Sequence, residues 1–101
     1  MGSISLKDWE VWLAKVPFED VDTFKVRPVL ILQGDAYKMT PQLVRRMSDH
    51  QIINYQAVNL KKPTTVELFP ALHIDKVILI KQIGELADVD RIEIGKIINS
   101  N

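Results

Sequence analysis

Short runs of hydrophobic residues, separated by single prolines and glycines, dominate the chain, and this pattern predicts β-strands. Residues 9–16 alternate loosely between apolar and polar side chains and stop at Pro17. Residues 26–33 are almost all aliphatic, which predicts a strand buried on both faces, with Pro28 near its start where a missing N–H donor is tolerated. Three further strands are predicted at 36–40, 64–69 and 77–83.

A tight turn is predicted between the second and third of these strands. Gly34 can take the positive φ that a short hairpin turn needs. If the turn is centred on Gly34 and Asp35, Thr40 lies opposite Val29 in the hairpin. Arg27 and Thr40 then approach one another across the two strands.

Helices are predicted in fewer places. Residues 42–47 fit either one helical turn or an ordered loop, and residues 54–60 fit a short helix. Asp88 is a good N-cap for a final helix. The apolar residues of that helix are Val89, Ile92, Ile94, Ile97 and Ile98. Several short strands with one terminal helix indicate a mainly β (α+β) fold, a small barrel or sandwich.

Length and composition narrow the class of protein. With 101 residues the chain should form one domain, residues 1–101, of which residues 1–6 are expected to be a flexible N-terminal segment. There is no cysteine, so disulfides, thiolate metal sites and cysteine nucleophiles are excluded, and we expect a cytoplasmic protein. No apolar run approaches the roughly 20 residues that span a bilayer, so no membrane partner is expected.

The charged residues cancel overall but are unevenly distributed. Thirteen basic residues balance thirteen acidic ones. Residues 25–62, however, contain seven basic and two acidic residues, a net charge of +5, whereas the flanking segments are acidic. This basic middle could bind a phosphate backbone, or it could be a scattered set of solvated surface charges.

Few residues suggest catalytic chemistry. Glu19, Asp20 and Asp22 lie in an acidic segment that we interpret as a solvated loop, and the two histidines lack metal-ligand spacing. His73 is interpreted as structural, whereas His50 lies in a polar run and is a candidate ligand contact.

The pair Arg27 and Thr40 is the remaining candidate. An arginine fork beside a hydroxyl suits a phosphate whose charge grows in a transition state, without a metal or cofactor. The same two residues could equally be an ordinary arginine and threonine at strand ends.

Several motifs in order along the chain resemble one known family. The run KVPFED at 15–20 is followed by KVRPVLIL at 25–32, then by KMT at 38–40, NLKKPTTV at 59–66 and IGEL at 83–86. This series, over residues 9–98, resembles the PemK/MazF-like toxins of bacterial type II toxin–antitoxin systems.

The resemblance implies a small SH3-like barrel of five to seven strands with a C-terminal helix, usually a homodimer. It implies a metal-independent endoribonuclease that cuts single-stranded RNA to cyclic-phosphate and 5′-hydroxyl ends, inhibited by a cognate antitoxin peptide. Arg27 and Thr40 match the family's catalytic positions. Because an arginine guanidinium stays protonated in proteins, we expect Arg27 to act by electrostatic stabilisation. The residues expected to contact RNA are Lys25, Gln33, Arg45, Lys61, Lys62 and Thr64.

The chain also differs from the family's pattern. The stretch between Leu32 and Thr40 is shorter, Pro41 replaces a small polar residue, and Glu67 stands where a basic residue is common. These differences leave an alternative open, in which the chain is a non-catalytic or degenerate member of the fold. Such a protein would bind a protein target, of the gyrase type or an antitoxin, or an RNA without cleaving it.

Overall fold

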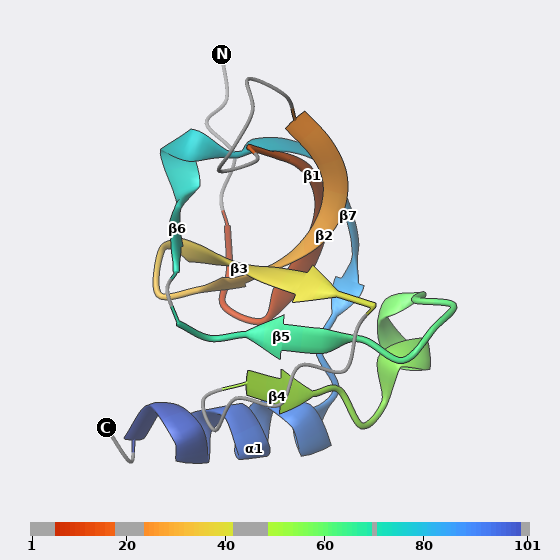
Figure 1. The fold of residues 1–101 in the computed structure, drawn as a ribbon. Coiled ribbons are helices and arrows are strands. Elements are labelled where there is room, and N and C mark those ends of the chain that lie inside the picture. The colour runs from red at the N-terminus through yellow and green to blue at the C-terminus, as the bar shows by residue number, and fades with distance from the viewer. Residues whose placement is uncertain (1–5, 18–23, 42–48, 70, 100–101) are drawn as a thin grey trace.

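The fold is built around one long antiparallel strand, β2 (Phe24–Leu32), which pairs on one side with β1 (Glu10–Pro17) and on the other with β3 (Asp35–Thr40). The computed structural model describes residues 6–17, 24–41, 49–69 and 71–99. Strand β1 also pairs with β7 (Ile78–Glu85), with two register shifts in the ladder. The three strands β2, β1 and β7 curve together around the upper part of the molecule (Figure 1).

The second half of the sheet begins where β3 leaves β2. After the pair Val29–Lys38, β3 pairs with β5 (Thr65–Glu67), and β5 pairs with β4 (Asp49–Gln51). The short strand β6 (Leu72–His73) pairs with the start of β3. The order is therefore β4-β5-β3-β2-β1-β7, with every described pair antiparallel.

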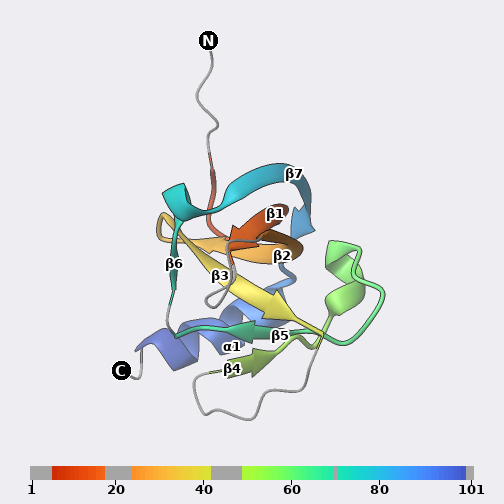
Figure 2. The same ribbon diagram turned by 45° about the horizontal axis from the view of Figure 1, so that its top comes forward.

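Three helical segments complete the described chain. The 3₁₀ helices η1 (Tyr55–Val58) and η2 (Ile74–Lys76) follow β4 and β6. The α-helix α1 (Asp88–Asn99) lies beneath β4 and β5 in Figure 1 and behind β5 in Figure 2. The predicted mainly β fold, a small barrel with a C-terminal helix, is confirmed. None of the helices among the described residues is long and apolar enough to cross a membrane.

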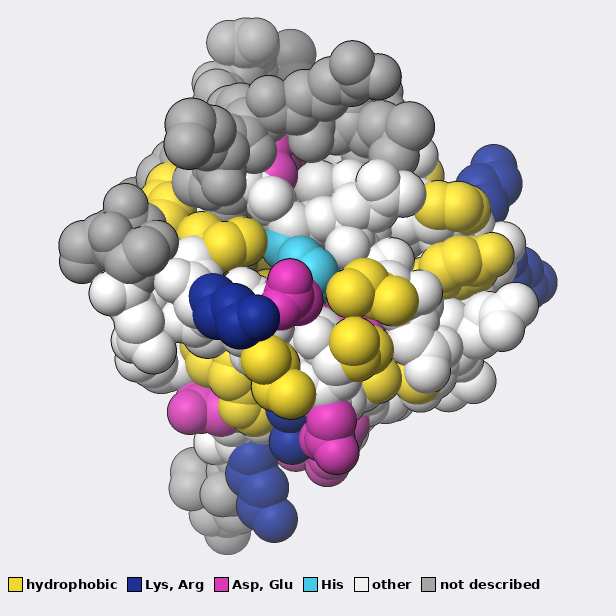
Figure 3. Space-filling model, turned by 90° about the horizontal axis from the view of Figure 1, so that it is seen from below, with side chains coloured by type: hydrophobic (Ala, Val, Ile, Leu, Met, Phe, Trp, Pro, Cys, Tyr) yellow, Lys and Arg dark blue, Asp and Glu magenta, His cyan; other side chains and the backbone are white. Residues whose placement is uncertain are grey.

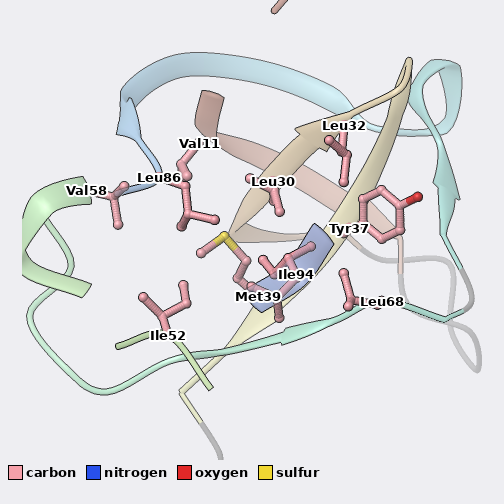
Figure 4. Packing of buried hydrophobic residues seen from close by; sticks show 11 residues of the cluster. Val11, Leu30, Leu32, Tyr37, Met39, Ile52, Val58, Leu68, Leu86 and Ile94 are labelled. Atoms are coloured by element: carbon pink, nitrogen blue, oxygen red, sulfur yellow. The ribbon is translucent and has the colours of Figure 1, made fainter. Parts of the chain in front are cut away.

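The core consists of two hydrophobic clusters on the two faces of the central strands. Alternate residues of β2 separate between them, because successive side chains of a strand point to opposite faces. Leu30 packs with Met39 and Ile94 of α1 in the larger cluster, where the side chains converge beneath the sheet (Figure 4). Val29 and Ile31 pack in the smaller cluster on the opposite face. The burial of β2 on both faces, predicted for residues 26–33, holds for Val29–Leu32 and fails for Val26, Arg27 and Gln33, which are exposed.

The two tryptophans pack against different hydrophobic clusters. Trp9 packs against the larger cluster and Trp12 against the smaller one. Leu6, which was expected to belong to a flexible N-terminal segment, packs against the smaller cluster as well. Residues 1–5 lie outside the described residues.

The register of the β2–β3 hairpin differs from the prediction. Val29 pairs with Lys38 rather than with Thr40. The turn residues are Gln33 and Gly34, with φ of 54° and 81°, the two positive angles of a type I′ turn. Asp8 stabilises this turn, because its Oδ1 accepts the Gln33 N–H at 2.9 Å. The shift is two residues, so Arg27 and Thr40 still belong to the same face of the hairpin.

Helix α1 also differs from its prediction in detail. Asp88 is the first helical residue and not the N-cap. Ile94 is fully buried, but Val89 and Ile92 are exposed at 43% and 60%. The buried face of α1 is therefore narrower than predicted, because it does not include Val89 and Ile92. Figure 3 shows the underside, where apolar and acidic side chains lie beside one another.

The other helices and strands compare with the predictions as follows. The short helix at 54–60 is confirmed as η1, and the strands at 9–16, 36–40, 64–69 and 77–83 correspond to β1, β3, β5 and β7. The strands β4 and β6 were not predicted. The expected acidic loop at 19–23 and the expected turn or loop at 42–47 lie outside the described residues.

Candidate nucleic-acid interface

A surface pocket of about 240 Å³ lies where β2 and β3 separate. Its lining combines cationic, apolar and hydroxyl side chains from three segments that are distant in sequence: Arg27, Pro28, Met39, Pro41, Leu60, Lys61, Lys62 and Thr64. We call it the Arg27 pocket. The segment after η1 approaches the end of β3 on this side of the molecule (Figure 2).

Local sequence explains why the pocket is open. Pro28 has no N–H to donate to a neighbouring strand. The pairing of β2 with β3 covers only Val29–Leu32, the residues that follow Pro28. Beyond that point β3 pairs with β5 instead. The fully buried Met39 and the apolar atoms of Pro28 and Leu60 therefore form the floor of the pocket, and the cations lie at its edge.

The cations at the pocket have capacity to bind an anion. Arg27, Lys61 and Lys62 are exposed. Arg27 makes one long contact, from Nη1 to the carbonyl oxygen of Val26 at 3.4 Å. None of the ion pairs found within the described part of the chain includes these three residues. Such an arrangement attracts phosphate, and arginine can bind it with two parallel hydrogen bonds.

The hydroxyl of Thr64 is held by a hydrogen bond within the protein. It is 5% exposed, and its Oγ1 donates to the carbonyl oxygen of Lys62 at 2.9 Å. The Thr64 carbonyl accepts the N–H of Ile52 at 2.8 Å. Thr64 therefore belongs to the pocket, as predicted for a site residue, but its hydroxyl is already used to hold the backbone of the lysine segment.

Thr40 is less well placed than Arg27. It is the last residue of β3 and pairs with Thr65 of β5. The hydroxyl oxygens of Thr40 and Thr65 are both buried, and neither has a hydrogen-bond partner. Thr40 does not line the Arg27 pocket, although its neighbours Met39 and Pro41 do. The predicted pair is thus brought to the same end of the hairpin, with only Arg27 facing the pocket.

The other predicted contacts are dispersed. Lys25 lies on β2 two residues before Arg27 and outside the pocket lining. Gln33 is at the opposite end of β2, roughly 20 Å of strand path from Arg27, and its N–H is taken by Asp8. Arg45 lies outside the described residues. The structure therefore groups Arg27, Lys61, Lys62 and Thr64, and places Gln33 elsewhere.

A second polar cluster, missed by sequence reasoning, lies between β4 and α1. Asp90 is fully buried, and His50 is 8% exposed. Asp90 Oδ1 lies 2.8 Å from His50 Nε2 and accepts the Ile53 N–H at 2.6 Å, while Oδ2 accepts the Asn54 N–H at 3.0 Å. The helical spacing of Asp90 with Ile94 and Ile98 could have revealed a core-facing aspartate.

This second cluster has no capacity for a substrate. The ring nitrogen Nε2 of His50 already faces the carboxylate, which also accepts two backbone N–H groups. The cluster therefore joins β4 to α1, and the candidate ligand role of His50 is not supported. No cluster of three or more potential metal ligands occurs among the residues that the structure describes.

The chain matches no protein-family model, and the search of curated proteins finds no match either.

Proposed function

We propose that this protein is a toxin-type endoribonuclease of the PemK/MazF-like kind, which cleaves single-stranded RNA at the Arg27 pocket. The observation that carries the proposal is the grouping of Arg27, Lys61 and Lys62 around one pocket, without carboxylate partners among the described residues. The apolar floor suits an unpaired base, and the cations suit the adjacent phosphates.

The proposed chemistry uses the nucleophile that RNA itself supplies. The 2′-oxygen attacks the neighbouring phosphorus, the bond to the 5′-oxygen breaks, and the products are a 2′,3′-cyclic phosphate and a 5′-hydroxyl. Water accepts the 2′-OH proton and returns a proton to the leaving oxygen. Arg27 binds the non-bridging oxygens, whose negative charge increases as the phosphorus becomes five-coordinate. Lys61 and Lys62 bind flanking phosphates and hold the strand in place.

A second candidate is binding of RNA without cleavage. The specific observation in its favour is that Thr40, the other expected catalytic residue, does not line the pocket. In this case the three cations would still bind single-stranded RNA, and no cyclic-phosphate product would form.

Two protein partners belong to the proposal. The first is an antitoxin with an acidic segment that binds the cations of the Arg27 pocket and excludes RNA. An acidic peptide that competes with RNA would support this partner, and a peptide that binds without competing would contradict it.

The second partner is another copy of the chain. Val26 and Ile78 pair with Lys15 in one row across β2, β1 and β7, and Phe24 pairs with Pro17 two residues further along the β1–β2 ladder. Phe24, Val26, Ile78 and Ile80 are each about half exposed. Several half-exposed apolar side chains on neighbouring strands, here flanking the exposed Lys15, are typical of an interface. Val26→Lys should convert a dimer to a monomer in light scattering, and an unchanged mass would place the interface elsewhere.

The decisive experiment incubates the protein with mixed-sequence single-stranded RNA in EDTA and identifies the product ends by mass spectrometry. Cyclic-phosphate ends from the wild type, lost in Arg27→Ala, are the expected result. Thr40→Val then tests the second catalytic residue, and Thr65→Val, which removes another buried hydroxyl without a hydrogen-bond partner, is its matched control. RNA that is bound but left intact would establish the second candidate instead.

A further inference from the structure

The two lysines of the Arg27 pocket lie on a short segment that is held at both ends. At its start, Asn59 ends η1 in the left-handed conformation, with φ of 60° and ψ of 28°. The Asn59 side chain donates from Nδ2 to the carbonyl oxygen of Ile83 in β7 at 2.7 Å. At its far end, the Thr64 hydroxyl donates to the Lys62 carbonyl at 2.9 Å. The lysine backbone is therefore restrained from both sides.

Gly84 brings β7 and η1 into direct backbone contact. A Cβ atom at this position would lie 3.0 Å from the Cα of Val58 and 3.4 Å from the carbonyl oxygen of Ala57. Both atoms belong to the backbone of η1, and Val58 is fully buried. No side chain can rotate to relieve this contact, so any larger residue at 84 must displace η1. The φ of Gly84 lies outside the left-handed region, so alanine there is opposed by the contact alone.

These contacts have a consequence for the pocket. Leu60 donates its N–H to the Tyr55 carbonyl at 3.2 Å, so the residue before the lysines is tied to η1. A displacement of η1 is thus transmitted to Lys61 and Lys62, which stand at the edge of the pocket with Arg27.

We propose that Gly84, Asn59 and Thr64 are positioning residues for RNA binding, because they hold Lys61 and Lys62 beside Arg27 at one pocket. This inference rests on the proposed RNA-binding function. A preorganised set of cations binds without a further ordering cost, whereas a displaced or mobile segment loses affinity with its charges intact.

The test is a double-mutant cycle on RNA affinity. Fluorescence anisotropy with a labelled single-stranded 12-nucleotide RNA would compare the wild type, Gly84→Ala, Lys61→Ala/Lys62→Ala, and the triple variant. We expect Gly84→Ala to weaken binding about tenfold. In the Gly84→Ala background, removal of the lysines should cost much less affinity than it does in the wild type. Gly95→Ala is the matched control, because a Cβ at Gly95 meets nothing within 4 Å.

The outcomes separate the inference from the proposed function. Equal effects of lysine removal in both backgrounds, or wild-type affinity in Gly84→Ala, would overturn the positioning role alone. A wild-type chain that fails to bind RNA at low salt would overturn the proposed function and this inference with it. If Gly84→Ala does not fold, Asn59→Gly and Thr64→Val take its place, because each removes one hydrogen-bond donor without adding an atom to a packed contact.

Discussion

Two polar clusters in this molecule differ in burial and in how many of their polar groups have partners within the protein. In the Asp90–His50 cluster the carboxylate is buried and accepts every donor that faces it, from His50 and from the backbone of Ile53 and Asn54. In the Arg27 pocket, Arg27, Lys61 and Lys62 are exposed and lie outside the ion pairs of the described residues. A satisfied, sealed cluster stabilises a fold, whereas an unsatisfied, open one binds a ligand.

Removal of the guanidinium should produce the largest effect on activity. Arg27→Ala is expected to lower the rate of RNA cleavage about 100- to 1000-fold, the usual cost of losing one group that stabilises transition-state charge. Because Arg27 is exposed, its thermal unfolding should stay close to that of the wild type. Quantified product formation checks the predicted loss of activity, and a thermal melt checks the predicted stability. A large loss of stability with retained activity would mean that Arg27 stabilises the fold and does not act on RNA.

The buried cluster should show the opposite result in an isosteric pair of variants. Asp90→Asn places an NH₂ group against the donors that face the carboxylate and should cost about 3 kcal/mol of unfolding free energy. Asp88→Asn removes the same charge from the same helical turn, but the Asp88 side chain is 94% exposed. Urea unfolding should therefore separate the two variants widely. Similar losses from both would mean that Asp90 acts only through the helix dipole.

The lysine pair should change the salt dependence of RNA binding. If Lys61 and Lys62 each neutralise one phosphate of a single strand, Lys61→Ala/Lys62→Ala should reduce the slope of log K against log salt by about 1.4. Anisotropy titrations between low and moderate salt measure this slope. Removal of Lys96, which pairs with Glu93 on α1, is the matched control and should leave the slope unchanged.

The smallest expected effect concerns a tyrosine of the core. Burial raises the pKa of Tyr37 above its usual value of 10.0, and the negative charge of Asp35 raises it further. The folded state therefore holds the Tyr37 proton more tightly than the unfolded state does. This contribution to stability is complete below pH 10 and is lost as the pH rises from 10 through the folded-state pKa.

Absorbance titration checks this direction. The chain has two tyrosines, so in Tyr55→Phe the phenolate absorbance reports Tyr37 alone. A midpoint above 10 is expected for the folded protein, and a midpoint at or below 10 would contradict the stated environment.

The sequence was sufficient for the fold because strand signals are local. Aliphatic runs bounded by Pro17 and Gly34 predicted the first strands, and Asp88 with the apolar residues after it predicted the terminal helix. The hairpin register was missed because the turn lies at Gln33 and Gly34, one residue earlier than predicted, and moving a two-residue turn by one residue shifts the strand pairing by two. The short strands β4 and β6 have three and two residues, too few for a periodic pattern.

The candidate site was predictable only in part. Arg27 and the lysines were indicated by the basic middle segment and by the motif resemblance. Pro28 marks where β2 and β3 separate, but the assembly of these residues into a pocket with Met39 and Leu60 also depends on the pairing of β3 with β5, which is distant in sequence. Asp90 and Asp88 are the same residue type in one helical turn, and only the spacing of Asp90 with Ile94 and Ile98 distinguishes the buried one from the exposed one in the sequence. The partners of Asp90 come from residues 50–54, which no local pattern identifies.

The most direct test of the account is a map of backbone amide shifts by NMR during titration with a short single-stranded RNA. The account predicts perturbations at Arg27 and at residues 60–64, with the amides of Ile53, Asn54 and Asp90 unchanged. Perturbations centred on the Asp90–His50 cluster, with none around Arg27, would contradict the central claim that the open pocket is where this protein meets RNA.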